Sequence, residues 1–181
     1  GVKLYVNRVF ITDDDKELLP PWLRFVKGVI DSSDLPLNVS REILQQNRIM
    51  AKIRSNSVKK ILDKLKTISG NKEKYGEFFE QYGRLIKEGV YQDFEHKEAL
   101  TELLRFKSTK DEGLVSLREY VERMRDDQKS IYYITGQNKI SLYNSPLLEM
   151  YRKKDIEVLL LDDEIDEIII SSIPKYDEKD L

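Results

Sequence analysis

The hydrophobic pattern changes period twice along the chain, and this constrains the fold more than any other feature. Val2 to Ile11 alternates apolar and polar side chains, as a strand does, until Asp13 to Asp15 break the run. From Ser40 to Ile68 the apolar side chains recur at every third or fourth position, which is the period of a helix. From Ile131 short strand-like runs return between helical stretches. The sequence therefore predicts a mixed α/β protein.

The first part of the chain is expected to hold two strands and a long helix. One strand runs from Val2 to Ile11 and the next from about Val26 to Ile30. The amphipathic helix begins at Ser40, has an interruption near Gln46 and Asn47, and ends at Ser69-Gly70-Asn71 by helix-stop chemistry. Because the chain opens with Gly1 and is at once in a strand, we expect a segment excised from a longer protein.

The middle of the chain is predicted to be helical. Tyr75 to Ile86 carries one apolar stripe, and Ala99 to Leu104 carries another. Lys107 to Gly113 is expected to be a polar loop. Ser116 and Glu119 have the spacing of a capping box, which predicts that a fourth helix begins there.

The last part alternates strands and helices. Strands are expected at Ile131–Thr135 and Ile156–Leu161, and helices at Leu142–Lys153 and Asp162–Ile173. This β-α-β-α order predicts a small parallel sheet with a right-handed crossover.

Composition excludes several classes of protein. The sequence has no cysteine, which removes disulfides, thiolate catalysis and cysteine-bound metal, and fits a reducing compartment. It has one histidine, His96, in a charged stretch, so we expect a solvated surface residue rather than a zinc ligand or a triad base. No apolar run approaches the roughly 20 residues of a membrane span.

Charge is distributed unevenly although the net charge is only -2. Seven basic residues lie between Arg48 and Lys66 against one acid, Asp63. This helix face is either solvated or able to follow a phosphate backbone, but no aromatic side chain interleaves its charges. The acidic runs Asp13–Asp15 and Asp162–Glu164 have ligands suited to Mg²⁺ or Ca²⁺, but they are expected to be solvated turns and helix starts because calcium-loop spacing is missing.

The run from Asp31 to Asn47 is the most distinctive stretch, because proline and asparagine shape a loop that presents Arg41 at the start of a helix. Gln45 lies one helical turn further on the same face. Arg41 is either a surface residue in an ion pair or a guanidinium directed towards a phosphate. No glycine-rich phosphate loop occurs in the chain, so no self-contained nucleotide site is expected.

The sequence resembles the middle segment of the heat-shock protein 90 chaperone family, in its bacterial high-temperature protein G type. The resemblance covers most of the chain. The stretches that carry it are Lys3–Ile11, Trp22–Ser32, the loop Asp31–Asn47, Leu103–Phe106 and Ser130–Gly136.

The resemblance implies an ATP-driven, dimeric chaperone that uses Mg²⁺, with its nucleotide pocket in a separate N-terminal domain and a dimerisation domain that follows this segment. Arg41 matches the loop arginine that reaches the γ-phosphate of ATP. Gln45 matches a supporting glutamine, and Asn38 matches an asparagine that helps to shape the site. The segment by itself is expected to be inactive.

Together with the changes in period at Ser40 and Ile131, the resemblance implies an α/β organisation in three parts. These are residues 1–68, an incomplete larger α/β subdomain with the catalytic loop; residues 69–128, a helical linker bundle; and residues 129–181, a small αβα subdomain with a short parallel sheet. Unfolded clients, a cytoplasmic location, and neither nucleic acid nor membrane as partner are expected. The alternative function is a non-enzymatic scaffold whose basic helix docks acidic partners or nucleic acid.

Overall fold

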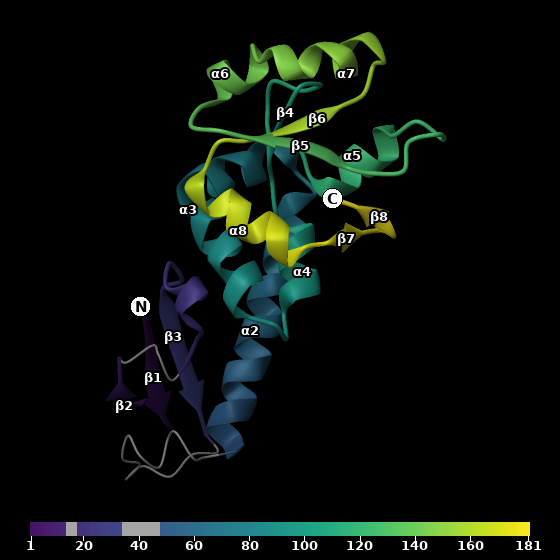
Figure 1. Ribbon diagram of the computed structural model, residues 1–181. Helices are drawn as coiled ribbons and strands as arrows, with labels where there is room; N and C mark the ends of the chain where they lie inside the picture. The colour runs from purple at the N-terminus through teal and green to yellow at the C-terminus, as the bar shows by residue number, and fades with distance from the viewer. Residues whose placement is uncertain (14–17, 34–47) are drawn as a thin grey trace. The chain divides into compact units, whose positions relative to one another are not determined.

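The computed structural model describes residues 1–13, 18–33 and 48–181. These residues form two compact units, Gly1–Thr67 and Ile68–Leu181 (Figure 1). The mixture of helices and small sheets confirms the predicted α/β class. The division into three parts stays a prediction. No helix of the described segments has the length and apolar content to cross a membrane.

The first unit contains a three-stranded sheet in the order β2-β1-β3. β1 (Val2–Val6) pairs antiparallel with β2 (Val9–Thr12) and parallel with β3 (Gly28–Ser32). The prediction of one strand from Val2 to Ile11 is wrong, because Asn7 and Arg8 form a tight turn between β1 and β2. Both have positive φ, 46° and 67°, as a two-residue hairpin turn requires.

Two further elements complete the first unit. Pro21 starts the short 3-10 helix η1 (Pro21–Leu23), which buries Trp22. α2 (Arg48–Ser69) buries Met50, Val58, Leu62 and Leu65, which follow the predicted helical period. Residues 40–47 of the predicted helix lie outside the described residues.

In the second unit, α3 (Lys72–Gln92) packs against α4 (Lys97–Glu102) and α8 (Glu164–Ser172). Asn71 caps α3 by accepting a hydrogen bond from the backbone N–H of Lys74. α5 (Leu117–Arg123) begins with the predicted capping box, in which Ser116 and Glu119 each accept a hydrogen bond from the other's backbone N–H. The starts of α3 and α5 are therefore set by local side chains.

The sheet of the second unit has the order β4-β6-β5. β5 (Tyr132–Thr135) and β6 (Val158–Leu161) are parallel, as predicted. The expected polar loop instead contributes β4 (Lys107–Ser108), which pairs antiparallel with β6, so the sheet is mixed and not purely parallel. β6 is buried along its whole length.

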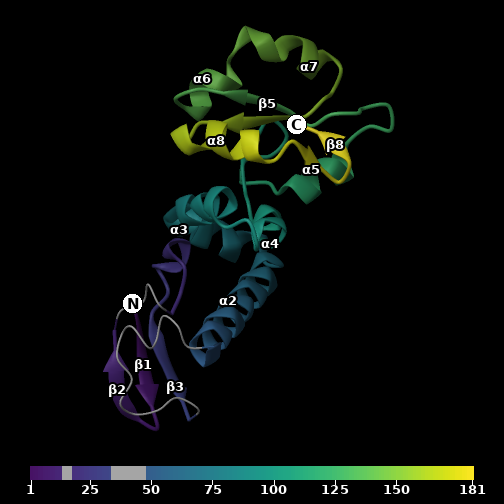
Figure 2. The ribbon, with the colours of Figure 1, turned by 60° about the horizontal axis from the view of Figure 1, so that its bottom comes forward.

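Helices cover both faces of this sheet (Figures 1 and 2). α6 (Lys139–Tyr143), the 3-10 helix η2 (Pro146–Leu148) and α7 (Glu149–Lys153) lie on one face, and α8 lies on the other. The prediction of one helix over Leu142–Lys153 is wrong, because Pro146 has no backbone N–H with which to continue it. The last residues form a hairpin, β7 (Lys175–Tyr176) and β8 (Lys179–Asp180).

A buried ion pair joins α3 to α8. The Lys87 ammonium lies 2.6 Å from the Asp166 carboxylate and 3.6 Å from that of Asp163. It also lies 5.9 Å and 5.8 Å from the ring centroids of Phe79 and Phe106. Burial raises the pKa of the Asp166 carboxyl, and the charge of Lys87 opposes that rise. Removing the cation leaves a buried carboxylate without its counter-charge.

We predict that Lys87→Met lowers the free energy of unfolding by about 3 kcal/mol at neutral pH. In the variant the pKa of Asp166 rises further above its unfolded value, so the folded state binds a proton more readily than the unfolded state does. The penalty is complete above the folded pKa and shrinks as pH falls through it. Urea unfolding at pH 8, 7, 6 and 5 measures the narrowing gap between variant and original chain.

The matched control is Arg84→Met. Arg84 lies on the same helix, but it is exposed and comes no closer than 3.9 Å to the Asp163 carboxylate. We expect it to change the free energy of unfolding by less than about 0.5 kcal/mol at every pH. If the loss of unfolding free energy in Lys87→Met stays constant from pH 8 to pH 5, it does not come from an ionised Asp166 left without Lys87.

Candidate functional site

The three residues predicted to form the site, Asn38, Arg41 and Gln45, lie outside the described residues. The structure does describe the elements that flank them in sequence, β3 on one side and α2 on the other. The end of β3 is tied to the turn between β1 and β2. The backbone N–H of Asn7 donates to the carbonyl of Ser32 at 3.1 Å, and that of Arg8 donates to the Asp31 carboxylate at 3.1 Å.

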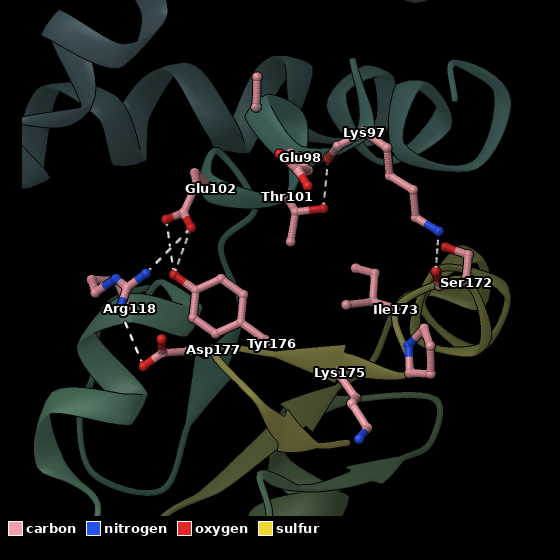
Figure 3. Close-up of a pocket in the computed structure, with 12 residues that line it drawn as sticks. Lys97, Glu98, Thr101, Glu102, Arg118, Ser172, Ile173, Lys175, Tyr176 and Asp177 are labelled. Atoms are coloured by element: carbon pink, nitrogen blue, oxygen red, sulfur yellow. Dashed lines mark hydrogen bonds and ion pairs between the residues drawn. The ribbon is translucent and has the colours of Figure 1, made fainter. Parts of the chain in front are cut away.

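A pocket of about 520 Å³ in the second unit is a candidate binding site, and its volume lies in the range of small-molecule sites (Figure 3). It lies among α4, the start of α5, the end of α8 and β7. Its lining is Lys97, Glu98, Ala99, Thr101, Glu102, Arg118, Ser172, Ile173, Pro174, Lys175, Tyr176 and Asp177.

One wall of this pocket is a polar cluster drawn from three elements. The Tyr176 hydroxyl donates to the Glu102 carboxylate at 2.8 Å, and the Arg118 guanidinium lies 5.1 Å from the Tyr176 ring centroid. Arg118 is also 3.6 Å from Glu102 and 3.4 Å from Asp177. Burial and the neighbouring Glu102 raise the pKa of the Tyr176 hydroxyl well above its usual value, so it remains a hydrogen-bond donor.

The opposite wall of the pocket contains the C-terminal end of α8. The Lys97 ammonium donates to the carbonyl of Ser172 at the C-terminal end of that helix, where a positive charge is favourable. Around the whole lining three basic side chains are matched by three acidic ones, and none of these groups is an imidazole or a thiol. These mixed charges suit recognition of a ligand that carries both charges, such as a peptide segment.

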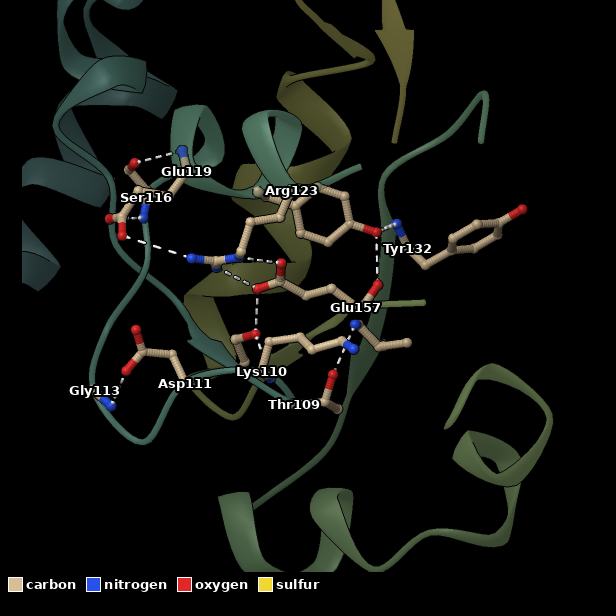
Figure 4. A network of polar contacts seen from close by, with 12 residues as sticks. Thr109, Lys110, Asp111, Gly113, Ser116, Glu119, Arg123, Tyr132 and Glu157 are labelled. Atoms are coloured by element: carbon tan, nitrogen blue, oxygen red, sulfur yellow. Dashed lines mark hydrogen bonds and ion pairs between the residues drawn. The ribbon is translucent and has the colours of Figure 1, made fainter. Parts of the chain in front are cut away.

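A second polar network holds α5, and with it Arg118, against the sheet (Figure 4). The buried Glu157 carboxylate accepts two hydrogen bonds from Arg123, at 2.9 Å and 2.7 Å, and one from Ser108. The Tyr120 hydroxyl donates to the carbonyl of Glu157 at 2.7 Å and accepts from the backbone N–H of Tyr132 at 3.0 Å. α5 is thereby joined to β4, to the start of β5 and to the residue that precedes β6.

His96 is not the solvated surface residue that the sequence predicts. Its Nδ1 lies 2.9 Å from the Asp93 carboxylate, and its side chain is only 22% exposed. The pair closes the turn before α4, where the backbone N–H of His96 also donates to Asp93. This arrangement is a local turn, and no group of three or more possible metal ligands occurs among the described residues.

Two pockets of the second unit have linings in which acidic and basic side chains are equal in number. The pocket beside Tyr176 places Glu98, Glu102 and Asp177 among its cations. A second cavity is lined by four glutamates and by four basic side chains, Lys72, Arg105, Lys107 and Lys139. A triphosphate carries several negative charges and is held by basic side chains and backbone N–H groups, and neither of these balanced linings offers it a net positive charge.

Sequence reasoning missed the pocket because it missed the last hairpin. Asp177 and Glu178 form its turn with positive φ, 49° and 63°, although neither is glycine or asparagine. The sequence signal for this hairpin was a pair of acidic residues, Asp177 and Glu178, between Tyr176 and Lys179. Arg118 and Glu102 meet only through the tertiary fold, and no spacing in the sequence reveals that contact.

Comparison with known proteins assigns the family. The family described as "Hsp90 protein" matches residues 1–181. The chain is 64% identical to the chaperone protein HtpG of Aliarcobacter butzleri over 98% of its own length, which is 28% of that protein. It is 61% identical to HtpG of Helicobacter acinonychis and 57% identical to HtpG of Borreliella burgdorferi, in each case over 98% of this chain and 29% of the relative.

The chain therefore belongs to the Hsp90 family. Within that family it is of the bacterial HtpG type, as the resemblance predicts. It spans less than a third of the length of these curated relatives.

We predict that Arg123→Ala destabilises the chain by about 2 kcal/mol, because it leaves the buried Glu157 carboxylate without two charge-assisted hydrogen bonds. The value lies below that for a fully buried pair because the Arg123 side chain is 37% exposed. At this chain length the midpoint of thermal unfolding falls by about 6 °C. Circular dichroism measures the change.

Arg125→Ala is the control, since Arg125 lies two residues further along and both its pair with Asp127 and its hydrogen bond to the Lys154 carbonyl are exposed. We expect its midpoint to stay within about 2 °C of the original. Equal midpoints for the two variants contradict a structural role for the Arg123–Glu157 contact.

Proposed function

We propose that this chain is a middle segment of an ATP-dependent molecular chaperone that assists protein folding. The observation that carries the proposal is the match of the whole chain, residues 1–181, to the Hsp90 family, with relatives named as HtpG chaperones. In that arrangement the first unit belongs to an incomplete larger α/β subdomain, followed by a helical linker and a small αβα subdomain.

Arg41 is the proposed catalytic residue of the segment. Phosphoryl transfer spreads negative charge over the transferred oxygens, and a planar guanidinium supplied from a second domain stabilises that charge when the domains close. Gln45 supports Arg41, and Asn38 shapes the loop on the γ-phosphate side. The ATP and its Mg²⁺ are held by the N-terminal domain of the same protein, so hydrolysis depends on closure.

The other partners follow from the same proposal. A C-terminal dimerisation domain follows the segment, and the intact protein acts as a homodimer in the cytoplasm. Its clients are unfolded or partly folded proteins. The mixed charges of the pocket beside Tyr176 are compatible with contact to a polypeptide.

The decisive test is Arg41→Ala in the full-length protein. We expect ATP affinity to stay close to unchanged and turnover to fall by up to about 10³-fold, as when an arginine finger is lost. Arg41→Lys rescues little, because an ammonium lacks the planar fork that spans two oxygens. Gln45→Ala is expected to lower turnover less than Arg41→Ala does, because a neutral amide makes weaker hydrogen bonds than a guanidinium.

Arg41→Ala also separates catalysis from folding when turnover and the thermal midpoint are measured on one preparation. If Arg41 only braces its own loop, the midpoint falls while turnover per folded molecule stays intact. That result removes Arg41 from the catalytic assignment and leaves the family assignment untouched.

A second candidate function is a non-enzymatic scaffold whose basic helix docks an acidic partner or a nucleic acid. The specific observation is that α2 exposes five lysines, Lys52, Lys59, Lys60, Lys64 and Lys66. Such a surface attracts anions by long-range electrostatics.

The scaffold role predicts that Lys59→Glu with Lys60→Glu abolishes docking and leaves ATP turnover of the full-length protein unchanged. Salt-dependent binding to an acidic peptide and to single-stranded DNA, measured by fluorescence anisotropy, checks this. The matched control is Lys3→Glu with Lys27→Glu, a reversal of the same size in the first unit and outside α2. Equal binding by the two double variants excludes the helix as the docking surface.

A further inference from the structure

One edge of the sheet in the second unit is open. In the order β4-β6-β5, the strand β5 has a neighbouring strand on one side only. The N–H of Gly136 donates to the carbonyl of Leu161, and parallel strands bond at every second residue, so positions 132, 134 and 136 face β6. Tyr133 and Thr135 therefore direct their N–H and carbonyl groups away from β6. No strand of the described residues pairs with that side of them.

This open edge lacks the features that usually protect an edge strand. β5 has the sequence Tyr-Tyr-Ile-Thr, with no proline and no charged side chain, and its register with β6 is regular. The opposite edge strand, β4, is only two residues long and begins with Lys107. A short strand with a lysine resists further pairing, whereas aromatic and β-branched residues favour it. β5 is therefore suited to accept another strand.

The last strand of the chain already lies at the start of this edge. The N–H of Ile131 donates to the carbonyl of Asp180 at 2.8 Å. Ile131 lies two positions before Tyr133, so its N–H points to the same open side. Asp180 and Ser130 form an isolated parallel bridge, so β8 and β5 run in the same direction. Figure 2 shows the C-terminal end beside this part of the sheet.

The bonds of β8 alternate between its two neighbours. The carbonyl of Asp180 bonds towards β5, and the N–H of Leu181 donates to the carbonyl of Pro174, on the side of β7, at 3.2 Å. Because bonding sides alternate along a strand, the residue after Leu181 in a longer chain faces β5 again. Continuing β8 in its present direction brings alternate residues opposite the free groups of β5.

Contacts of β7 hold the hairpin in this position. The Tyr176 hydroxyl donates to the Glu102 carboxylate at 2.8 Å, and the Arg118 guanidinium lies over the Tyr176 ring. Arg118 also lies 3.4 Å from Asp177 in the hairpin turn. The wall of the pocket beside Tyr176 thus sets the direction in which the chain leaves β8.

A second copy of the chain, or an unrelated extended peptide, fits this edge less well. Asp180 occupies its beginning, and a strand that comes from elsewhere has to be ordered along its whole length. A segment joined to β8 has one end already held beside β5, which raises its effective concentration there. This chain spans less than a third of the length of its curated relatives.

We propose that the residues after Leu181 in the full-length protein extend β8 as a strand parallel to β5, so that the sheet continues in the order β4-β6-β5-β8. The inference rests on the proposed function in one respect, which is that another domain follows this segment. The chain that leads to that domain is then part of the sheet and not a free linker. Movement of the domain is passed to the second unit through backbone hydrogen bonds.

Amide hydrogen exchange without ATP tests this pairing residue by residue, by NMR spectroscopy. The 181-residue chain is compared with the same chain lengthened by the next residues of the full-length protein, about eight, which is enough to pass the end of β5. We expect the amides of Tyr133 and Thr135 to exchange at least about 100-fold more slowly in the longer form, because both become hydrogen-bonded within a sheet. The amide of Ile134 faces β6 and is the internal control, protected in both forms.

The same measurement is made on the full-length protein by mass spectrometry of the peptide that contains β5. We expect its exchange to match that of the longer form and to be slower than that of the 181-residue chain.

Thr135→Pro tests the edge by mutation. Proline removes the N–H that the added strand needs and is tolerated on the free side of an edge strand. We expect the midpoint of thermal unfolding to fall by about 3 °C more in the longer form than in the 181-residue chain. The 181-residue chain is the matched control, because loss of the Thr135 side chain affects both forms.

Each of three results overturns the proposal. The first is equal exchange of the Tyr133 and Thr135 amides in the two forms, and the second is an equal effect of Thr135→Pro on the two midpoints. The third is protection of these amides in the 181-residue chain that grows with protein concentration, which assigns the edge to a second copy. None of these results bears on Arg41, whose role is tested by ATP turnover, so either proposal can fail without the other.

Discussion

The buried Glu157 carboxylate is the interaction on which much of the second unit depends. A carboxylate that is 6% exposed is costly unless its oxygens are hydrogen-bonded, and Arg123 and Ser108 meet that requirement from α5 and β4. Its backbone carbonyl accepts from Tyr120, which in turn accepts from the start of β5. Glu157, which immediately precedes the central strand β6, thus connects α5, β4 and β5.

This constraint also shapes the pocket. Arg118 precedes Tyr120 and Arg123 on the same short helix, so the contacts of those two residues set the position of the guanidinium that lies over Tyr176. α5 has only seven residues, too few to be stable as a helix by itself. Its capping box and its hydrogen bonds to Glu157 supply the stability that its length does not.

Features that depend on local sequence were predictable, and those that depend on tertiary contacts were not. The capping box at Ser116, the buried run of β6 and the period of α2 follow from neighbouring residues, and the structure contains all three. The two hairpin turns were missed, because Arg8 and Glu178 adopt positive φ against their intrinsic preference. β4 is only two residues long and exists because β6 offers it an edge, so no pattern could reveal it.

The residues of the candidate site also differ in how they could be predicted. Arg41 was found by resemblance, since its proposed ligand belongs to another domain and leaves no pattern within this chain. For an arginine to act across domains, the chain on either side of it must be anchored, because a guanidinium stabilises a transition state only when its position is set in advance. β3 supplies one anchor through the bonds of Asn7 and Arg8 to its last residues, and the buried Met50 near the start of α2 supplies the other. The proposed mechanism therefore requires both anchors to be rigid. Loosening either one would lower the rate of ATP turnover without changing the affinity for ATP.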